Sequence, residues 1–152
     1  MTKKKFFLAA AVGIFFQTAQ AQLDSTKEQF IHVPFRIGIA PGLSSQGKND
    51  INTTSNFSLN IWGGHTGSVN GLELGSLFNI DKKDVQYVQA AGLFNMVGGN
   101  VKGVQLSGLF NAVQGSVAGI QYSGLTNYVA NNMYGIQGST LHNHAGGKLK
   151  RI

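Results

Sequence analysis

The sequence of 152 residues contains no cysteine, only two prolines and few charged side chains, which make up 12% of the chain. Without cysteine the protein can form neither a disulfide nor a thiolate, and this excludes cysteine nucleophiles and cysteine-bound metals. The prolines are Pro34 and Pro41, so nothing in the second half of the chain interrupts an extended backbone. The net charge of +6 is spread along the sequence without a basic run long enough to favour nucleic acid as a partner.

The N-terminus has the pattern of a secretory signal peptide. Lys3, Lys4 and Lys5 precede an apolar run from Phe6 to Phe16, and Ala19-Gln20-Ala21 has the small residues that signal peptidase accepts. As a helix this apolar run is about 16 Å long, which is too short to cross about 30 Å of hydrocarbon. The pattern therefore predicts a signal peptide at residues 1–21, cleavage before Gln22 and export of the protein.

Residues 22–56 are expected to form an N-terminal strand and a surface loop. Apolar and other residues alternate from Phe30 to Ala40, which is typical of a strand, and Pro34 places this strand at an edge or start. The polar stretch from Ser44 to Asn56 has the composition of a surface loop.

Residues 57–152 are predicted to contain six copies of a repeat of sixteen residues, because aligning the copies gives columns of similar residues. The leucine column is Ile61, Leu77, Leu93, Leu109, Leu125 and Leu141. The next two columns are Trp62, Phe78, Phe94, Phe110, Thr126 and His142, and then Gly63, Asn79, Asn95, Asn111, Asn127 and Asn143. A further column reads Glu73, Gln89, Gln105, Gln121 and Gln137.

Within each copy apolar and polar residues alternate, with the apolar residues mainly at even positions and the polar ones mainly at odd positions. Short segments rich in Gly, Asn and Asp separate the copies, as tight turns require. The pattern predicts an all-β protein whose strands of about ten residues have one apolar face and one polar face.

Two architectures fit this pattern. The leading prediction is an antiparallel sheet of the membrane β-barrel type, in which the apolar face contacts lipid. The alternative is a β-solenoid with one coil per repeat, in which the Asn column forms a ladder of amides. The exposed row of aromatic side chains that a solenoid requires argues against it. A third arrangement is a soluble sandwich that covers its apolar face with a partner.

The repeats resemble a family of surface-repeat proteins of Gram-negative bacteria, whose units read Val-x-Gly-x-Gln-x-x-Gly-Leu-x-Asn. The phrases that carry the resemblance are NFSLNIWGG, VNGLELGSLFNI, VQYVQAAGLFNMVGGNVKGVQLSGLFNAV and GIQYSGLTN, and it covers roughly Phe30 to Asn143. The resemblance implies an exported protein at the outer membrane or cell surface, and it implies no activity.

Few residues suggest chemistry. His142 and His144 lie on one side of a predicted strand and form a weak candidate for a metal site, since no third ligand is near in sequence. Asp81 and Asp84 flank two lysines and are expected to lie in a solvated turn, whereas Glu73 in the Gln column is expected to contact amides such as Gln89. No catalytic constellation, metal site or cofactor site is predicted.

The sequence thus predicts a non-enzymatic protein of the outer membrane or cell surface with a structural or interaction role. Its expected partners are outer-membrane lipid, an unknown surface ligand and further copies of itself, because open sheet edges with amide columns can add strands. The alternative function is that of a secreted β-solenoid which binds a glycan, a protein or copies of itself along its ladders.

Overall fold

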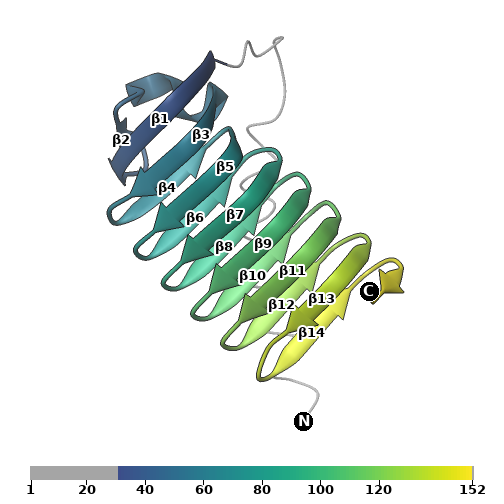
Figure 1. The fold of residues 1–152 in the computed structure, drawn as a ribbon. Coiled ribbons are helices and arrows are strands. Elements are labelled where there is room, and N and C mark those ends of the chain that lie inside the picture. The colour runs from purple at the N-terminus through teal and green to yellow at the C-terminus, as the bar shows by residue number, and fades with distance from the viewer. Residues whose placement is uncertain (1–30, 152) are drawn as a thin grey trace.

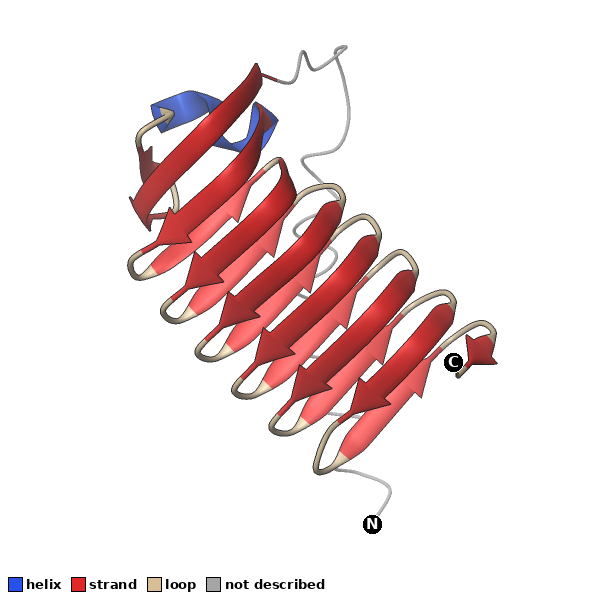
Figure 2. Cartoon of the chain, viewed as in Figure 1, coloured by secondary structure: helices blue, strands red, loops and turns tan. Residues whose placement is uncertain are grey.

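The computed structural model describes residues 31–151, which form a β-solenoid of about six coils (Figure 1). The predicted signal peptide at residues 1–21 lies outside the described residues. Each coil contributes one strand to each of two sheets, and short loops join the strands at both edges (Figure 2). No helix within residues 31–151 has the length and apolar character needed to cross a membrane.

The larger sheet has nine strands. In spatial order they are β15 (Leu149–Lys150), β13 (Met133–Gly138), β11 (Val117–Ser123), β9 (Val101–Ser107), β7 (Val85–Ala91), β5 (Ser68–Gly75), β3 (Thr53–Asn60), β1 (Ile31–Ala40) and β2 (Leu43–Ser44). The smaller sheet has six strands, which are β14 (His142–Ala145), β12 (Thr126–Val129), β10 (Phe110–Val113), β8 (Phe94–Val97), β6 (Phe78–Asp81) and β4 (Gly63–Thr66).

Neighbouring strands pair in parallel, and from β5 onward residues sixteen apart face each other, as Gln105 faces Gln121 between β9 and β11. Among the described strands only β1 and β2 pair antiparallel. The predicted antiparallel sheet is therefore wrong, and the membrane barrel based on it is not confirmed. The alternative prediction of a β-solenoid is confirmed.

A corner of two residues explains why the sequence pattern suggested strands of about ten residues. In the second full coil β5 ends at Gly75, Ser76 and Leu77 form the corner, and β6 begins at Phe78. Because the corner holds an even number of residues, the alternation continues unchanged from one strand to the next. Odd positions point inward in both strands, as the buried Glu73 and Asn79 show.

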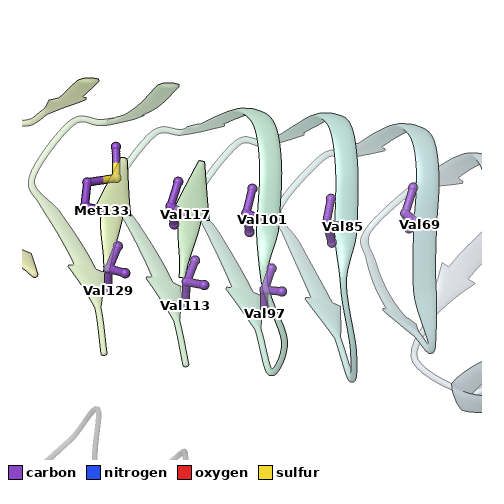
Figure 3. Close-up of a cluster of buried hydrophobic side chains, with 8 residues drawn as sticks. All are labelled: Val69, Val85, Val97, Val101, Val113, Val117, Val129 and Met133. Atoms are coloured by element: carbon purple, nitrogen blue, oxygen red, sulfur yellow. The ribbon is translucent and has the colours of Figure 1, made fainter. Parts of the chain in front are cut away.

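The interior is divided between an apolar core and two polar ladders. Figure 3 shows the apolar core, in which side chains from successive coils line up next to the loops that lead into the larger sheet. Its members are Val69, Val85, Val97, Val101, Val113, Val117, Val129 and Met133. All eight are at most 2% exposed, so this narrow row contributes hydrophobic stabilisation to each coil it passes through.

The N-terminal end of the solenoid is covered by a small cap. The stretch from Ser44 to Asn56, expected to be a surface loop, contains the 3₁₀ helix η1 (Gly47–Asn52) and the first residues of β3. Asp50 in η1 is only 2% exposed and faces the interior, where it pairs with Arg36 of β1. The polar composition of this segment therefore serves a buried contact as well as a solvated surface.

The first coil is one residue shorter than the repeat alignment assumed. Gly63 faces Phe78 and Gly64 faces Asn79, so Trp62 falls outside the aromatic column and Gly63 outside the Asn column. The place of the missing asparagine is taken by Asn60, which donates its side-chain amide to Asn79 Oδ1 at 2.8 Å. A Cβ atom at Gly64 would lie 2.1 Å from the Asn60 Nδ2 atom, so glycine is needed there.

Candidate functional site

The larger sheet presents to the outside two adjacent columns of apolar side chains, which we call the apolar face. The parallel register places the members of each column side by side on successive strands from β1 to β13. One column is Phe35, Phe57, Leu72, Val88, Val104, Ile120 and Ile136, and the other is Ile37, Leu59, Leu74, Ala90, Leu106 and Tyr122. Apart from the Tyr122 hydroxyl, these side chains offer no hydrogen-bonding group.

The apolar face is exposed although its members shield one another. Phe35 is 50% exposed, Ile136 is 45% exposed and Leu106 is 40% exposed. Seven strands spaced by about 4.8 Å give the face a length of about 29 Å. A contiguous apolar surface of this size on a protein commonly marks an interaction site.

β-branched and aromatic side chains favour this arrangement because they pack well on a pleated surface. In a parallel ladder each side chain also contacts its counterpart in the next coil. The rings of Phe35 and Phe57 stack with their centroids 4.8 Å apart and their planes inclined by 3°. The ladder therefore packs the outward side chains of neighbouring coils against one another.

The aromatic column of the smaller sheet also lies on the outside. The centroids of Phe78 and Phe94 are 5.2 Å apart, and those of Phe94 and Phe110 are 4.9 Å apart. Because the rings stack on one another, each is only partly exposed. This stacking answers the objection that a solenoid would turn a row of aromatic side chains fully to water. Towards the C-terminus the column continues with Thr126 and His142, so this sheet lacks an apolar face of comparable length.

The Asn and Gln columns form continuous hydrogen-bonded ladders inside the coils. Asn95 donates to Asn111 Oδ1 at 2.9 Å, and Gln121 donates to Gln105 Oε1 at 2.7 Å. Asn79, Asn95, Asn111 and Asn127 each also donate to a main-chain carbonyl, as Asn111 does to Tyr122 at 2.8 Å. The amides are thus satisfied within the protein, and their role is structural.

At the N-terminal end the Gln column contains charged residues. Arg36 Nε lies 2.5 Å from Asp50 Oδ1, and the Arg36 guanidinium also donates to Ser58 Oγ at 3.0 Å. Glu73 accepts hydrogen bonds from Asn60 at 2.9 Å and from Gln89 at 2.8 Å. The predicted contact between Glu73 and amide groups is confirmed.

Asp81 was expected in a solvated turn, and this prediction is wrong. Its side chain points inward from the end of β6 and is 1% exposed, at the position that Val97 occupies in the next coil. Burial, followed by the charge of Glu73, raises the pKa of Asp81 well above its ordinary value. The raised pKa favours the neutral form of Asp81, which lets it lie beside Glu73 in the interior.

Asp84, the other carboxylate of that turn, is exposed and accepts a hydrogen bond from the Asn100 main chain at 2.7 Å. Alternation would have distinguished the two, since Asp81 lies at an inward odd position and Asp84 in the loop. His65 lies near the Arg36–Asp50 pair, and burial lowers the pKa of its imidazole.

His142 and His144 lie on β14 with their ring centroids 6.2 Å apart, and the His144 ring stacks on Tyr128 at 5.0 Å. No group of three or more His, Cys, Asp or Glu side chains able to hold a metal ion is found within residues 31–151. The two histidines therefore find no third ligand of these types in the described part of the chain.

The apolar face is the surface best suited to a function, because the polar and charged groups of the interior are closed to solvent. Arg36 and Glu73 are fully buried. No protein-family model, curated protein or solved structure matches the chain. The proposals that follow therefore rest on the geometry of the chain itself and on its sequence.

Proposed function

We propose that the protein is an exported, non-enzymatic scaffold that binds a partner at the cell surface through the outer ladders of its solenoid. The observation that carries the proposal is the exposed apolar face, which contrasts with an interior of buried amides and carboxyls. This arrangement, with polar groups inside and apolar side chains outside, leaves an apolar surface where a partner can reach it. Export is expected from the predicted signal peptide at residues 1–21.

The resemblance to the surface-repeat proteins of Gram-negative bacteria supports the outer membrane or the cell surface as the location. The β-solenoid gives this role a physical basis, since stacked coils form a long, rigid platform without needing a large core. The enclosed ladders supply rigidity, and the outer columns supply contact area.

The experiment is a fractionation of the full chain, carrying a C-terminal epitope tag, in a Gram-negative host. The proposal expects the processed protein in the envelope fraction, and retention of the unprocessed chain in the cytosol would overturn it. Purified wild-type protein should also bind isolated envelopes, and Leu106→Gln on the apolar face should weaken this binding.

The matched control is Tyr128→Gln on the smaller sheet, which should bind envelopes like the wild type. Tyr128 also points outward, but from the opposite side of the solenoid. Equal losses for the two variants would contradict a role for the apolar face.

Self-association is a second candidate function, favoured by the C-terminal end of the described solenoid. Within residues 31–151, β14 pairs with β12 on one side and with no strand on the other. The amide ladders reach this end at Gln137 and Asn143, which can offer hydrogen bonds to a further coil. Light scattering of the purified protein tests it, and a monodisperse monomer at high concentration would exclude it.

A further inference from the structure

The accessible charges of the solenoid are almost all positive, because folding places most of its carboxylates inside. Of the four carboxylate residues in residues 31–151, Asp50, Glu73 and Asp81 are at most 2% exposed, and only Asp84 is exposed. The exposed cations of the same segment are Lys48, Lys83, Lys102, Lys148, Lys150 and Arg151. The surface therefore has a strong positive excess.

Most of these cations border the apolar face. Lys102 is the first outward-pointing residue of β9, and it lies two positions before Val104 of the apolar face. Lys150 of β15 faces Tyr134 of β13, in the same outward column as Lys102. Tyr134 lies two positions before Ile136 of the apolar face. Lys83 and Lys148 lie in the loops that lead from the smaller sheet into the larger one. We call this border, made of Lys83, Lys102, Lys148 and Lys150, the basic rim.

We propose that the apolar face and its basic rim dock on the surface of an anionic phospholipid bilayer. The proposal rests on the proposed function and names the partner of the same surface. Apolar side chains enter the boundary between headgroups and acyl chains, while the flexible ends of the rim lysines reach the phosphates. The combination of apolar area and cations beside it is what interfacial binding to anionic lipid requires.

Other occupants fit the surface less well. A glycan would need hydrogen-bonding side chains, and the apolar face offers only the Tyr122 hydroxyl. A second copy of the chain, placed face to face, would bring two basic rims together with only Asp84 from each copy to offset them. An anionic bilayer instead satisfies both the apolar columns and the cations.

The test is flotation of the purified protein with vesicles of phosphatidylcholine alone or with an equal amount of phosphatidylglycerol. The proposal predicts flotation with the anionic vesicles and little with the neutral ones. Binding should weaken strongly between 0.1 M and 1 M salt, because the screening length falls from about 10 Å to about 3 Å. Equal flotation with both vesicle types, or none with either, would overturn the proposal.

Single substitutions separate the two parts of the surface. Lys102→Gln should weaken binding about fivefold, since each cation near an anionic bilayer contributes about that factor. Leu106→Gln should weaken it about tenfold through the loss of apolar area. The controls Lys48→Gln, in the cap, and Tyr128→Gln, on the opposite sheet, should leave binding unchanged, and losses as large in these controls would contradict the assignment.

The proposed surface role and the assignment of lipid as the partner can be tested separately. Binding to isolated envelopes without binding to anionic vesicles would overturn the lipid assignment and leave the proposed surface role in place. Loss of binding to both would remove the surface role as well. A dimer in light scattering that Leu106→Gln dissociates would identify a second copy as the occupant and would also overturn the lipid assignment.

Discussion

Asn95 donates its side-chain amide to Asn111 Oδ1 across 2.9 Å, and the two residues face each other at the same position of β8 and β10. The contact recurs from Asn79 to Asn143, so one ladder of amides follows the smaller sheet from β6 to β14. This relationship fixes the parallel register, because a shift by one residue would turn the amides outward.

Asn111→Ala should lower the free energy of unfolding by about 2 to 4 kcal/mol, since it leaves the buried Asn127 Oδ1 without this donor and the buried Asn95 amide without this acceptor. Chemical denaturation followed by circular dichroism measures the loss. The matched control is Asn143→Ala, at the exposed end of the ladder, which should cost less than about 1 kcal/mol. Similar costs at both positions would contradict a cooperative interior ladder.

Asp81→Val should stabilise the protein at neutral pH and flatten the dependence of its stability on pH. Since burial and Glu73 raise the pKa of Asp81 in the folded state, the folded protein keeps a proton that the unfolded chain releases. The favourable contribution is fully present below the ordinary pKa of 3.8 and is lost as pH rises through the folded pKa.

Denaturation midpoints measured across this pH range should therefore decline for the wild type and decline less for Asp81→Val. Asp84→Asn, in the exposed turn next to it, serves as the control and should keep the wild-type profile. An unchanged slope in Asp81→Val would show that another group sets the pH dependence.

Gly119→Ala should be strongly destabilising, whereas Tyr87→Gly at the matching position two coils earlier should not. Gly119 has a φ of +143°, and a Cβ atom there would lie 2.0 Å from the Gly103 carbonyl oxygen. Tyr87 adopts a φ of +76° with a side chain that is 64% exposed, so replacing it relieves backbone strain and removes little packing. Thermal melting should place Gly119→Ala well below the wild type and Tyr87→Gly at or above it.

Asp50→Ala should cost about 3 to 5 kcal/mol, because it leaves the fully buried Arg36 guanidinium without its counter-ion. The double variant Arg36→Met with Asp50→Ala should recover part of this loss, since it removes the unpaired charge. Denaturation of the two single variants and the double variant gives the coupling energy. Additive losses would mean that the pair does not act as a unit.

The sequence allowed the repeat, the strands and the two faces of each strand to be predicted, but not the direction in which strands pair. Alternation continues through the corner at Ser76 and Leu77, so two short strands on different sheets have the same pattern as one long strand. The polar face was correctly identified, and an interior filled by amides such as Gln105 is compatible with a barrel lumen or a solenoid core. The parallel pairing of residues sixteen apart is what distinguishes the solenoid from the barrel.

The candidate site was less predictable. Leu106 and Val104 lie on the face that was expected to be apolar. Their neighbours come from strands sixteen residues away, and the sequence alone does not show that these strands lie side by side in one sheet. Asp81 was misplaced because the composition of its turn outweighed its inward position. The cap was missed because the partner of Asp50 is Arg36, in a different element.

The most direct test of the parallel solenoid is disulfide formation in chains with two introduced cysteines, which is simple because the protein has none of its own. Lys102 faces Ala118 between β9 and β11, so Lys102→Cys with Ala118→Cys should crosslink on mild oxidation and lose both free thiols. Lys102→Cys with Tyr128→Cys, a pair that an antiparallel hairpin would bring together, should keep both thiols free. Crosslinking of the second pair and not the first would contradict the parallel fold.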